Sequence, residues 1–481
     1  MPAVDASEAL ACRKLSQLPG PKGLPLLGNA LEVRREQLHH VLERWAREFG
    51  PTYQWGTPGR RMLTVTDHKL IATLLRDRPA GFDRPIRLAQ ISEEMGLPGG
   101  VFRANGETWQ RQRRMVMSGL DPTHVRAYMP SINQVANRLL ARWEMAAARN
   151  ASIDLQGDLM RYTVDTIAGL AFGADVNTLQ SDGEVIQDHL DKIFPAFRRR
   201  STALLPYWRW MKLAADRELD KSIAEVLGAI ERFIAQARAR LEASPALRER
   251  PSNLLESMIV AAQAHDSGVS DRDVAGNVLT MLLAGEDTTA NSLAWMIDLL
   301  VRHPVTLARA TQEIRDWLPG NGALAFDTQR MGELPYLDAC IQETMRLKPV
   351  APFIPLEANG TTTVGNVEVP AGTLVFCLLR HDSVQDSSFP DAADFRPERW
   401  LETAAPPVAR QVSMPFGAGA RICPGRYLAL LEMKIAMAVL LGRFDIESLR
   451  TPDGAPPAEL LNFTMAPVGL QMRLRPRTQK L

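Results

Sequence analysis

The pattern of hydrophobic and polar positions divides the chain into three parts. From Leu18 the segment LPGPKGLPLLGN is rich in proline and glycine, which predicts an extended lead-in, and the pieces PTYQW and RMLTVTD that follow predict short strands. From about Glu107 to Leu347 apolar residues recur with helical periodicity between Gly and Pro breaks. Beyond Pro349 the β-branched alternation of TTTVGNVEVPAGTLVFCLL predicts a small sheet. The sequence therefore predicts a mainly α fold with a small β region.

The same pattern contains no convincing domain boundary. A length of 481 residues would by itself allow about two to four domains. The sequence has no internal repeat, and the proline-rich stretches PALRERPS and TAAPPVA are typical of loops and not of linkers. We therefore predict an N-terminal tail at residues 1–17 and a single domain at residues 18–481.

Composition and charge narrow the class of protein. With 46% hydrophobic residues, 23% charged residues and a formal net charge of +1, the chain has the material for a core and no overall charge that would attract nucleic acid. The first residues contain no apolar run long enough for a signal peptide or a membrane anchor. We therefore expect a soluble, cytoplasmic monomer. The few cysteines are scattered without a C-x-x-C spacing, which argues against disulfides or a zinc site: Cys12, Cys340, Cys377 and Cys423.

One predicted helix, Ser270 to His303, carries an unusual motif in its middle. The segment AGEDTTAN, Ala284 to Asn291, places glycine, acids and threonines where a helix former is expected. One interpretation is a tolerated kink in which the threonine hydroxyls bond back to the previous turn. The other is a local widening of the helix, with a pocket lined by Asp287 and Thr288 that delivers protons to a group bound beside Gly285.

A second group of residues suggests a structural clamp. Glu343 and Arg346 are three residues apart on a predicted helix, so they share a face. An exposed ion pair of this kind contributes only about 0 to 1 kcal/mol to the stability of the folded protein. Arg399 in the loop FRPERW offers a second guanidinium, and one carboxylate held by both arginines would fix the helix to the loop before the cysteine.

That cysteine, Cys423, lies in the glycine-rich segment PFGAGARICPG. The glycines permit positive φ, and Pro424 is suited to begin a helix, so the thiol lies at a helix N-terminus that favours a thiolate. A lone cysteine is most often a small buried hydrophobic residue. The alternative is an axial ligand to a haem iron, with Arg421 as a counter-charge to the haem propionates.

Taken together, these motifs resemble those of the cytochrome P-450 family. FGAGARICPG matches the family's F-x-x-G-x-R-x-C-x-G signature in every fixed position, and AGEDTT, ETMR and FRPERW are similar to three further hallmarks in the right order. Trp109 and Arg113 in WQRQR resemble a W-x-x-x-R pair. The resemblance extends from about residue 18 to the C-terminus, and the joint occurrence of the motifs is highly specific.

The resemblance implies a triangular helical domain with haem b, iron protoporphyrin IX, between the long helix and the cysteine loop. Cys423 would be the iron ligand, Phe416 would shield it, and Trp109, Arg113 and Arg421 match positions that pair with haem propionates. Two further residues fall near another propionate partner, although their alignment is loose: Arg380 and His381.

By the same resemblance, Asp287 and Thr288 would relay protons while one oxygen atom of O2 enters a C–H or C=C bond. Ala284 would pack over the haem face. Further positions match the family's substrate-lining stretches, and their apolar character implies a lipophilic substrate: Val350, Ala351, Phe353 and Thr464.

The resemblance also suggests an electron source. No flavin-domain sequence follows the last residue, so we expect a separate ferredoxin or flavodoxin with its NAD(P)H reductase as electron donor. A basic patch of Arg111, Arg114, Arg426 and Lys434 would receive it. Two other readings are a haem-thiolate isomerase, dehydratase or peroxide-driven enzyme, and a non-enzymatic haem protein. Both need no proton relay, so Asp287 and Thr288 count against them.

Overall fold

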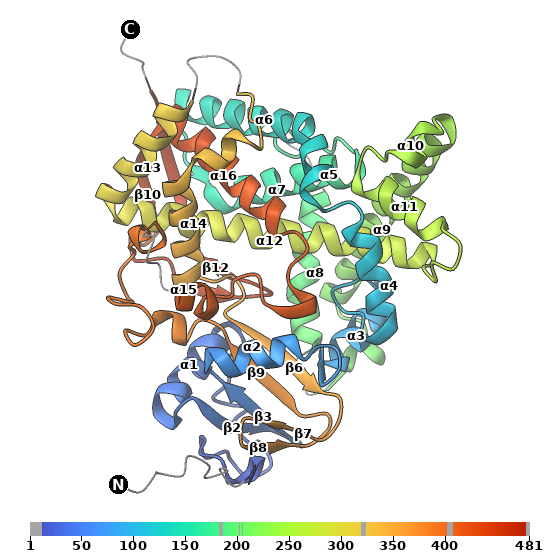
Figure 1. Ribbon diagram of the computed structural model, residues 1–481, viewed down its shortest axis with the longest axis vertical. Coiled ribbons are helices and arrows are strands. Elements are labelled where there is room, and N and C mark those ends of the chain that lie inside the picture. The colour runs from blue at the N-terminus through green and yellow to red at the C-terminus, as the bar shows by residue number, and fades with distance from the viewer. Residues whose placement is uncertain are drawn as a thin grey trace, which may run out of the picture. The chain divides into compact units, whose positions relative to one another are not determined.

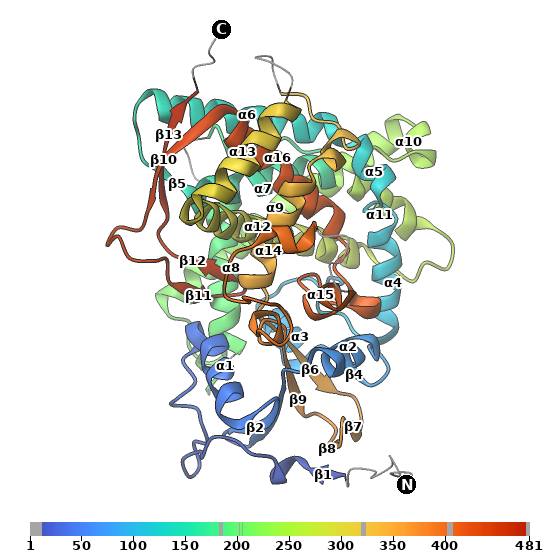
Figure 2. The ribbon, with the colours of Figure 1, turned by 60° about the vertical axis from the view of Figure 1, so that its left-hand side comes forward.

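The computed structural model describes residues 12–181, 186–201, 203, 205–318, 324–401 and 407–477. The chain divides into two compact units (Figures 1 and 2). The first comprises Met1–Ile86, Ala351–Ala392 and Pro407–Ile422, and the second comprises Arg87–Val350, Ala393–Pro406 and Cys423–Leu481. The predicted single domain at residues 18–481, with its preceding tail, stays a prediction.

The first unit is built on a five-stranded sheet in the order β2-β3-β9-β6-β4. The predicted pieces PTYQW and RMLTVTD form the antiparallel pair β2 and β3, and the alternating segment after Pro349 forms later strands. A smaller sheet, β1-β8-β7, begins with residues before Leu18. The strands are β1 (Arg13–Lys14), β2 (Thr52–Thr57), β3 (Arg60–Val65), β4 (Phe82–Asp83), β6 (Phe353–Ala358), β7 (Thr362–Val364), β8 (Val367–Val369) and β9 (Leu374–Leu378).

Side-chain alternation along the five-stranded sheet gives it two buried faces. On β3, Met62 packs in the cluster that contains Trp45 of α1, whereas Leu63 packs in the cluster that contains Ile71 of α2. Successive side chains of a strand point to opposite faces, so α1 and α2 cover opposite sides. The helical elements of this unit are η1 (Leu15–Gln17), η2 (Arg35–Gln37), α1 (Leu38–Phe49), α2 (His68–Arg76), η5 (Asp382–Val384), α15 (Pro407–Val412) and η7 (Gly419–Arg421).

The second unit is mainly helical. Its helices up to the long α12 are α3 (Ile86–Glu94), α4 (Gly106–Met117), α5 (Pro122–Ala127), α6 (Met129–Ala148), α7 (Leu155–Phe172), α8 (Ile186–Ser201), η3 (Tyr207–Arg209), α9 (Ala214–Ala243), α10 (Ala246–Glu249) and α11 (Leu254–Gln263). Those from α12 onward are α12 (Asp271–Arg302), α13 (Pro304–Trp317), η4 (Arg330–Glu333), α14 (Pro335–Leu347), η6 (Pro397–Trp400) and α16 (Arg426–Arg443). This arrangement confirms the predicted mainly α fold class with a small β region.

The long helix α12 passes through the middle of the helices of this unit (Figure 1). It begins at a capping box, in which the Ser270 hydroxyl accepts from the Asp273 backbone N–H and the Asp273 carboxylate accepts from the Ser270 backbone N–H. It ends at Arg302, just before Pro304 begins α13. The prediction of one helix from Ser270 to His303 is therefore confirmed.

Short strands complete the second unit. They form a sheet in the order β10-β13-β5 and a hairpin of β11 with β12. The hairpin brings its turn, residues 462–464, close to α12, because Trp295 of that helix donates from Nε1 to the Met465 carbonyl at 3.0 Å. The strands are β5 (Ile153–Asp154), β10 (Phe444–Arg450), β11 (Glu459–Leu461), β12 (Met465–Pro467) and β13 (Gln471–Pro476).

Candidate functional site

The motif in the middle of α12 keeps its helical backbone. Every residue of AGEDTTAN is α-helical, and the Thr288 hydroxyl donates to the Ala284 carbonyl at 2.7 Å. Gly285 faces α7, because a Cβ placed on it would lie 2.7 Å from Cδ1 of Ile167. The helix is therefore not widened at this motif, and Gly285 provides close helix packing. The role of Asp287 and Thr288 in proton delivery stays a prediction.

Asp287, on the same helix, has a buried network of polar partners. Its carboxylate accepts from Nδ2 of Asn291 at 2.7 Å and from the hydroxyl of Thr464, and Nδ2 of Asn291 also lies 3.1 Å from that hydroxyl oxygen. Gln156 of α7 donates to Oδ1 of Asn291 at 2.9 Å. Burial raises the pKa of Asp287, and the hydrogen bonds from Thr464 and Asn291 oppose that rise. The carboxyl group is thus fixed in position, and its pKa lies above its usual range.

The sequence analysis did not identify Gln156 or Asn291 as partners of Asp287. Asn291 carries a usable signal, because it follows Asp287 by four residues and therefore lies on the same helix face. Gln156 carries none, since it lies 135 residues away from Asn291 in the chain.

The structure brings the three residues of the suggested clamp together. Glu343 of α14 accepts two bonds of 2.8 Å from Arg346 and one of 2.9 Å from Nε of Arg399. The same carboxylate also accepts from Nε1 of Trp400 at 2.8 Å and from the backbone N–H of Arg396 at 3.0 Å. The sequence did not indicate these two contacts. Burial alone would raise the pKa of Glu343, but the hydrogen bond and charge of Arg346, with the other donors, hold it below its usual range. The carboxylate therefore joins α14 to η6 in its ionised form.

Cys423 lies just before α16, separated from its first residue by Pro424 and Gly425. Its side chain is open to solvent, yet the protein packed around the sulfur raises the pKa of the thiol. The backbone N–H of Gly425 and the charges of Arg113 and Arg426 act in the opposite direction and favour the thiolate. One accessible sulfur with a backbone donor and two cations is a donor set that fits a single thiolate ligand to a haem iron.

The other residues expected around a haem are divided between the two units. Trp109 is buried on α4, one turn before the half-buried Arg113, and both belong to the second unit with Ala284. Phe416 and Arg421 belong to the first unit, where Phe416 is half-buried and Arg421 donates to Oδ1 of Asp83 at 2.7 Å. The haem contacts of these residues stay predictions.

Two residues that we expected near another propionate have protein partners, and their place near a propionate stays a prediction. Arg380 is buried and donates from Nε and Nη2 to the two oxygens of Glu43 on α1, at 2.7 and 2.8 Å. His381 lies with Nδ1 at 3.1 Å from Asp382, which is also 3.0 Å from Nδ1 of His68 on α2. These contacts fix η5 and the residues before it to the two helices that flank the sheet.

The predicted substrate-lining residues are also placed in different surroundings. The Met465 backbone N–H donates to the Val350 carbonyl at 2.8 Å, which brings Val350 next to the turn that holds Thr464. Thr464 itself is buried, with its hydroxyl committed to Asp287. In the first unit Ala351 is half-buried, and the ring of Phe353 packs against that of Phe376.

The expected basic patch is smaller than predicted. Lys434 is buried and donates to the Met331 carbonyl at 2.9 Å and to Asp338 at 2.8 Å, so its inclusion was wrong. Arg114 is exposed, whereas Arg111 is partly covered and lies 3.5 Å from Glu107. The helical pattern of α16 placed Lys434 on a face that packs against neighbouring elements.

Comparison with known proteins matches residues 18–474 to the family model described as cytochrome P450. A self-sufficient cytochrome P-450 monooxygenase of Aspergillus kawachii is 28% identical over 440 residues, which are 89% of this chain and 40% of that protein. One of Aspergillus niger is 27% identical over 447 residues, 90% of this chain and 39% of that protein. A crystal structure of the cytochrome P450DA haem domain has the same fold, with a TM-score of 0.81 and 22% identity, over 96% of this chain and 98% of that chain.

These findings correct the expected electron donor. The relatives are named self-sufficient, and the chain spans about two-fifths of their length. The prediction of a separate ferredoxin or flavodoxin with its reductase is therefore wrong. In the part of the chain that the structure describes, no helix is long and apolar enough to cross a membrane.

Proposed function

Because the chain belongs to the cytochrome P-450 family, we propose that it is a haem-thiolate monooxygenase in which Cys423 binds the iron of iron protoporphyrin IX. The observation that carries this proposal is the accessible sulfur of Cys423 just before α16. Burial raises the pKa of this thiol, and the Gly425 N–H and the charges of Arg113 and Arg426 oppose that rise. When bound, the haem supplies the chemistry of O2 activation, which a thiolate ligand promotes by donating electron density. Arg113, together with Trp109 and Arg421, is proposed to hold the propionates.

The protons that such a reaction consumes have a source in α12. The Asp287 carboxyl group is fixed by Asn291 and Thr464, and its burial favours the protonated form. Thr288 is the next residue and keeps its hydroxyl on the Ala284 carbonyl. We assign Asp287 to hold the proton and Thr288 to pass it on, since a hydroxyl both accepts and donates.

We propose that the reaction inserts one oxygen atom of O2 into a C–H or C=C bond of a lipophilic substrate, while the other oxygen atom leaves as water with two protons and two electrons from a reductant. Support comes from the apolar character of Val350, Ala351 and Phe353, and from the small side chain of Ala284. A panel of apolar compounds of graded size, titrated into the ferric protein, tests this part by the shift of the Soret band. Absence of a shift with every apolar compound, together with a shift by hydrophilic compounds of the same sizes, would contradict a lipophilic substrate.

The thiolate assignment is tested by the Soret band of the reduced carbon monoxide complex. The parent protein is expected to show the strongly red-shifted band of thiolate ligation, and Cys423→Ala is expected to lose it. Cys12→Ala is the matched control, because Cys12 is also exposed but belongs to the other unit. An unchanged band in Cys423→Ala would remove Cys423 from the site.

A peroxide-driven reaction is the second candidate, and the Asp287 network argues against it. A peroxide substrate brings its own protons and both electrons, so it needs no buried acid beside the site. Product formation with O2 and a reductant, compared with hydrogen peroxide alone, separates the two. Equal product with peroxide alone would favour the second candidate.

A further inference from the structure

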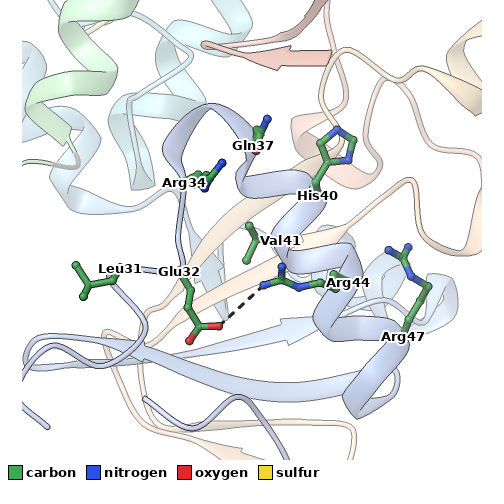
Figure 3. Close-up of a pocket in the computed structure, with 8 residues that line it drawn as sticks. All are labelled: Leu31, Glu32, Arg34, Gln37, His40, Val41, Arg44 and Arg47. Atoms are coloured by element: carbon green, nitrogen blue, oxygen red, sulfur yellow. Dashed lines mark ion pairs between the residues drawn. The ribbon is translucent and has the colours of Figure 1, made fainter. Parts of the chain in front are cut away.

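The first unit contains a cavity of about 660 Å³ between the loop before α1 and one face of that helix (Figure 3). Its lining residues are mainly polar or basic: Leu31, Glu32, Arg34, Gln37, His40, Val41, Arg44 and Arg47. A volume of this size is in the range of sites that hold small organic ligands, about 300 to 1,000 Å³. The cavity is therefore large enough for a ligand with more than one chemical group.

The fold of α1 explains why these side chains gather. Leu42 and Trp45 are buried against the sheet and fix the orientation of the helix. His40, Arg44 and Arg47 follow one another at spacings of four and three residues, so they share the opposite, exposed face. Arg34 reaches the same cavity from the loop before the helix (Figure 3). Arginine side chains from the loop and from α1 thus line the same cavity.

The positive charge of the cavity is only weakly compensated by the protein. Glu32 lies 4.0 Å from Arg44, and both side chains are about half exposed, so the pair contributes about 0 to 1 kcal/mol. Within the described residues, neither Arg34 nor Arg47 has a carboxylate partner for its side chain. Glu43 of the same helix is buried and paired with Arg380, so it does not compensate the positive charge of the cavity.

The chemistry of this set selects the kind of ligand. Three guanidinium groups offer more N–H donors than the two oxygens of a carboxylate can accept, whereas the several oxygens of a phosphate group can accept from all three. Leu31, which is 71% exposed, and Val41 add apolar surface beside the charges. We propose that the cavity binds a phosphate group carried by an amphiphilic molecule, with Arg34, Arg44 and Arg47 on the phosphate.

Such a group can come from a phospholipid headgroup or from a free organic phosphate. The probes are dihexanoylphosphatidic acid below its micelle concentration, dihexanoylphosphatidylcholine as the zwitterionic control, and inorganic phosphate as competitor. Isothermal titration of the whole chain in low-salt buffer is expected to show saturable binding of the phosphatidic acid and none of the phosphatidylcholine. Displacement by equal concentrations of inorganic phosphate would assign the site to free phosphates, and resistance to it would assign the lipid headgroup.

The variant test uses Arg34→Gln with Arg47→Gln, and the matched control is Arg60→Gln with Arg61→Gln. The control arginines are exposed on β3 of the same unit, so both pairs remove the same charge. We expect the cavity variant to bind at least tenfold more weakly and the control to bind like the parent. Circular dichroism and the carbon monoxide spectrum verify that both fold. Absence of saturable binding by the parent, or equal losses in the two variants, would overturn the proposal.

Discussion

Asp287 and Thr288 are adjacent in the chain, yet their side chains have different surroundings. Among the residues that the structure describes, the Thr288 hydroxyl bonds only within its own helix, to Ala284, whereas the Asp287 carboxylate contacts Asn291 and Thr464. Removing the hydroxyl therefore costs little packing, while changing the acid disturbs a buried network. A substitution of Thr288 therefore tests proton transfer alone, whereas a substitution of Asp287 also changes the support of the structure.

For Thr288→Ala, we predict that haem content and substrate-induced spectral shifts stay at the parental level. The amount of product per reducing equivalent is expected to fall several-fold, with peroxide as the by-product, because the proton path loses its donor. Thr289→Ala is the control at the neighbouring position of the helix. Unchanged product yield in Thr288→Ala would remove that hydroxyl from the proton path.

Asn291 is a positioning residue in the same network. Asn291→Ala is expected to release the Asp287 carboxylate and to shift the pH profile of product formation. Burial raises the pKa of Asp287, and the hydrogen bond from Asn291 is one of the interactions that lower it. Loss of this bond should therefore raise the pKa further and move the profile to higher pH. Ser292→Ala, at the next position of α12, is the control. A profile unchanged in Asn291→Ala would show that this bond does not orient the acid.

At the scale of single elements, the Glu343 carboxylate fixes α14 to η6. Glu343→Gln leaves the buried guanidinium of Arg346 without its counter-charge, and breaking a buried pair of this kind costs about 3 to 5 kcal/mol. Glu218→Gln, in the exposed pair with Lys192, is the control and should cost about 0 to 1 kcal/mol. Denaturant unfolding followed by circular dichroism measures both.

The pH dependence of the Glu343 pair gives a second readout. The pKa of Glu343 in the folded protein is lowered. The stabilisation that the ionised carboxylate gives to the folded state is therefore fully present above the unfolded pKa of about 4.3, and it is lost as the pH falls through the folded-state pKa. The difference in unfolding free energy between the parent and Glu343→Gln should therefore shrink in acid. A constant difference across that range would contradict the role of the ionised carboxylate.

Two glycines of α12 differ in what their neighbours can tolerate. A Cβ at Gly276 would lie 1.9 Å from the Gly99 carbonyl oxygen, a backbone atom, whereas a Cβ at Gly285 would meet the end of the Ile167 side chain. Gly276→Ala should therefore destabilise by about 1 to 3 kcal/mol or more, and Gly285→Ala by clearly less. Thermal unfolding compares them. Equal losses would mean that α12 moves as a rigid body away from both neighbours.

On the scale of the whole molecule, local patterns predicted elements, but among distant contacts they predicted the clamp of Glu343 with Arg399, 56 positions apart, and missed others. The ends of α12 could be predicted because Ser270 and Asp273 are close in sequence. The bond between Asp287 and Thr464 joins residues 177 positions apart, and the pairing of Arg380 with Glu43 joins residues 337 apart. Periodicity contains no information on such pairs, which is why the pairing of Arg380 with Glu43 could not be predicted.

Removal of the haem is expected to affect the two units of the protein unequally. A ligand that binds the folded state stabilises the part of the protein that holds it. Cys423, Arg113 and Ala284 belong to the second unit, where α12 and α16 pack together. We therefore expect hydrogen exchange of α12 and α16 to speed up on haem extraction by at least tenfold. The strands β2 and β3 of the first unit should change less, because their contacts are with α1, α2 and their own sheet. An equal increase in both units would mean that the haem stabilises the molecule as one cooperative body.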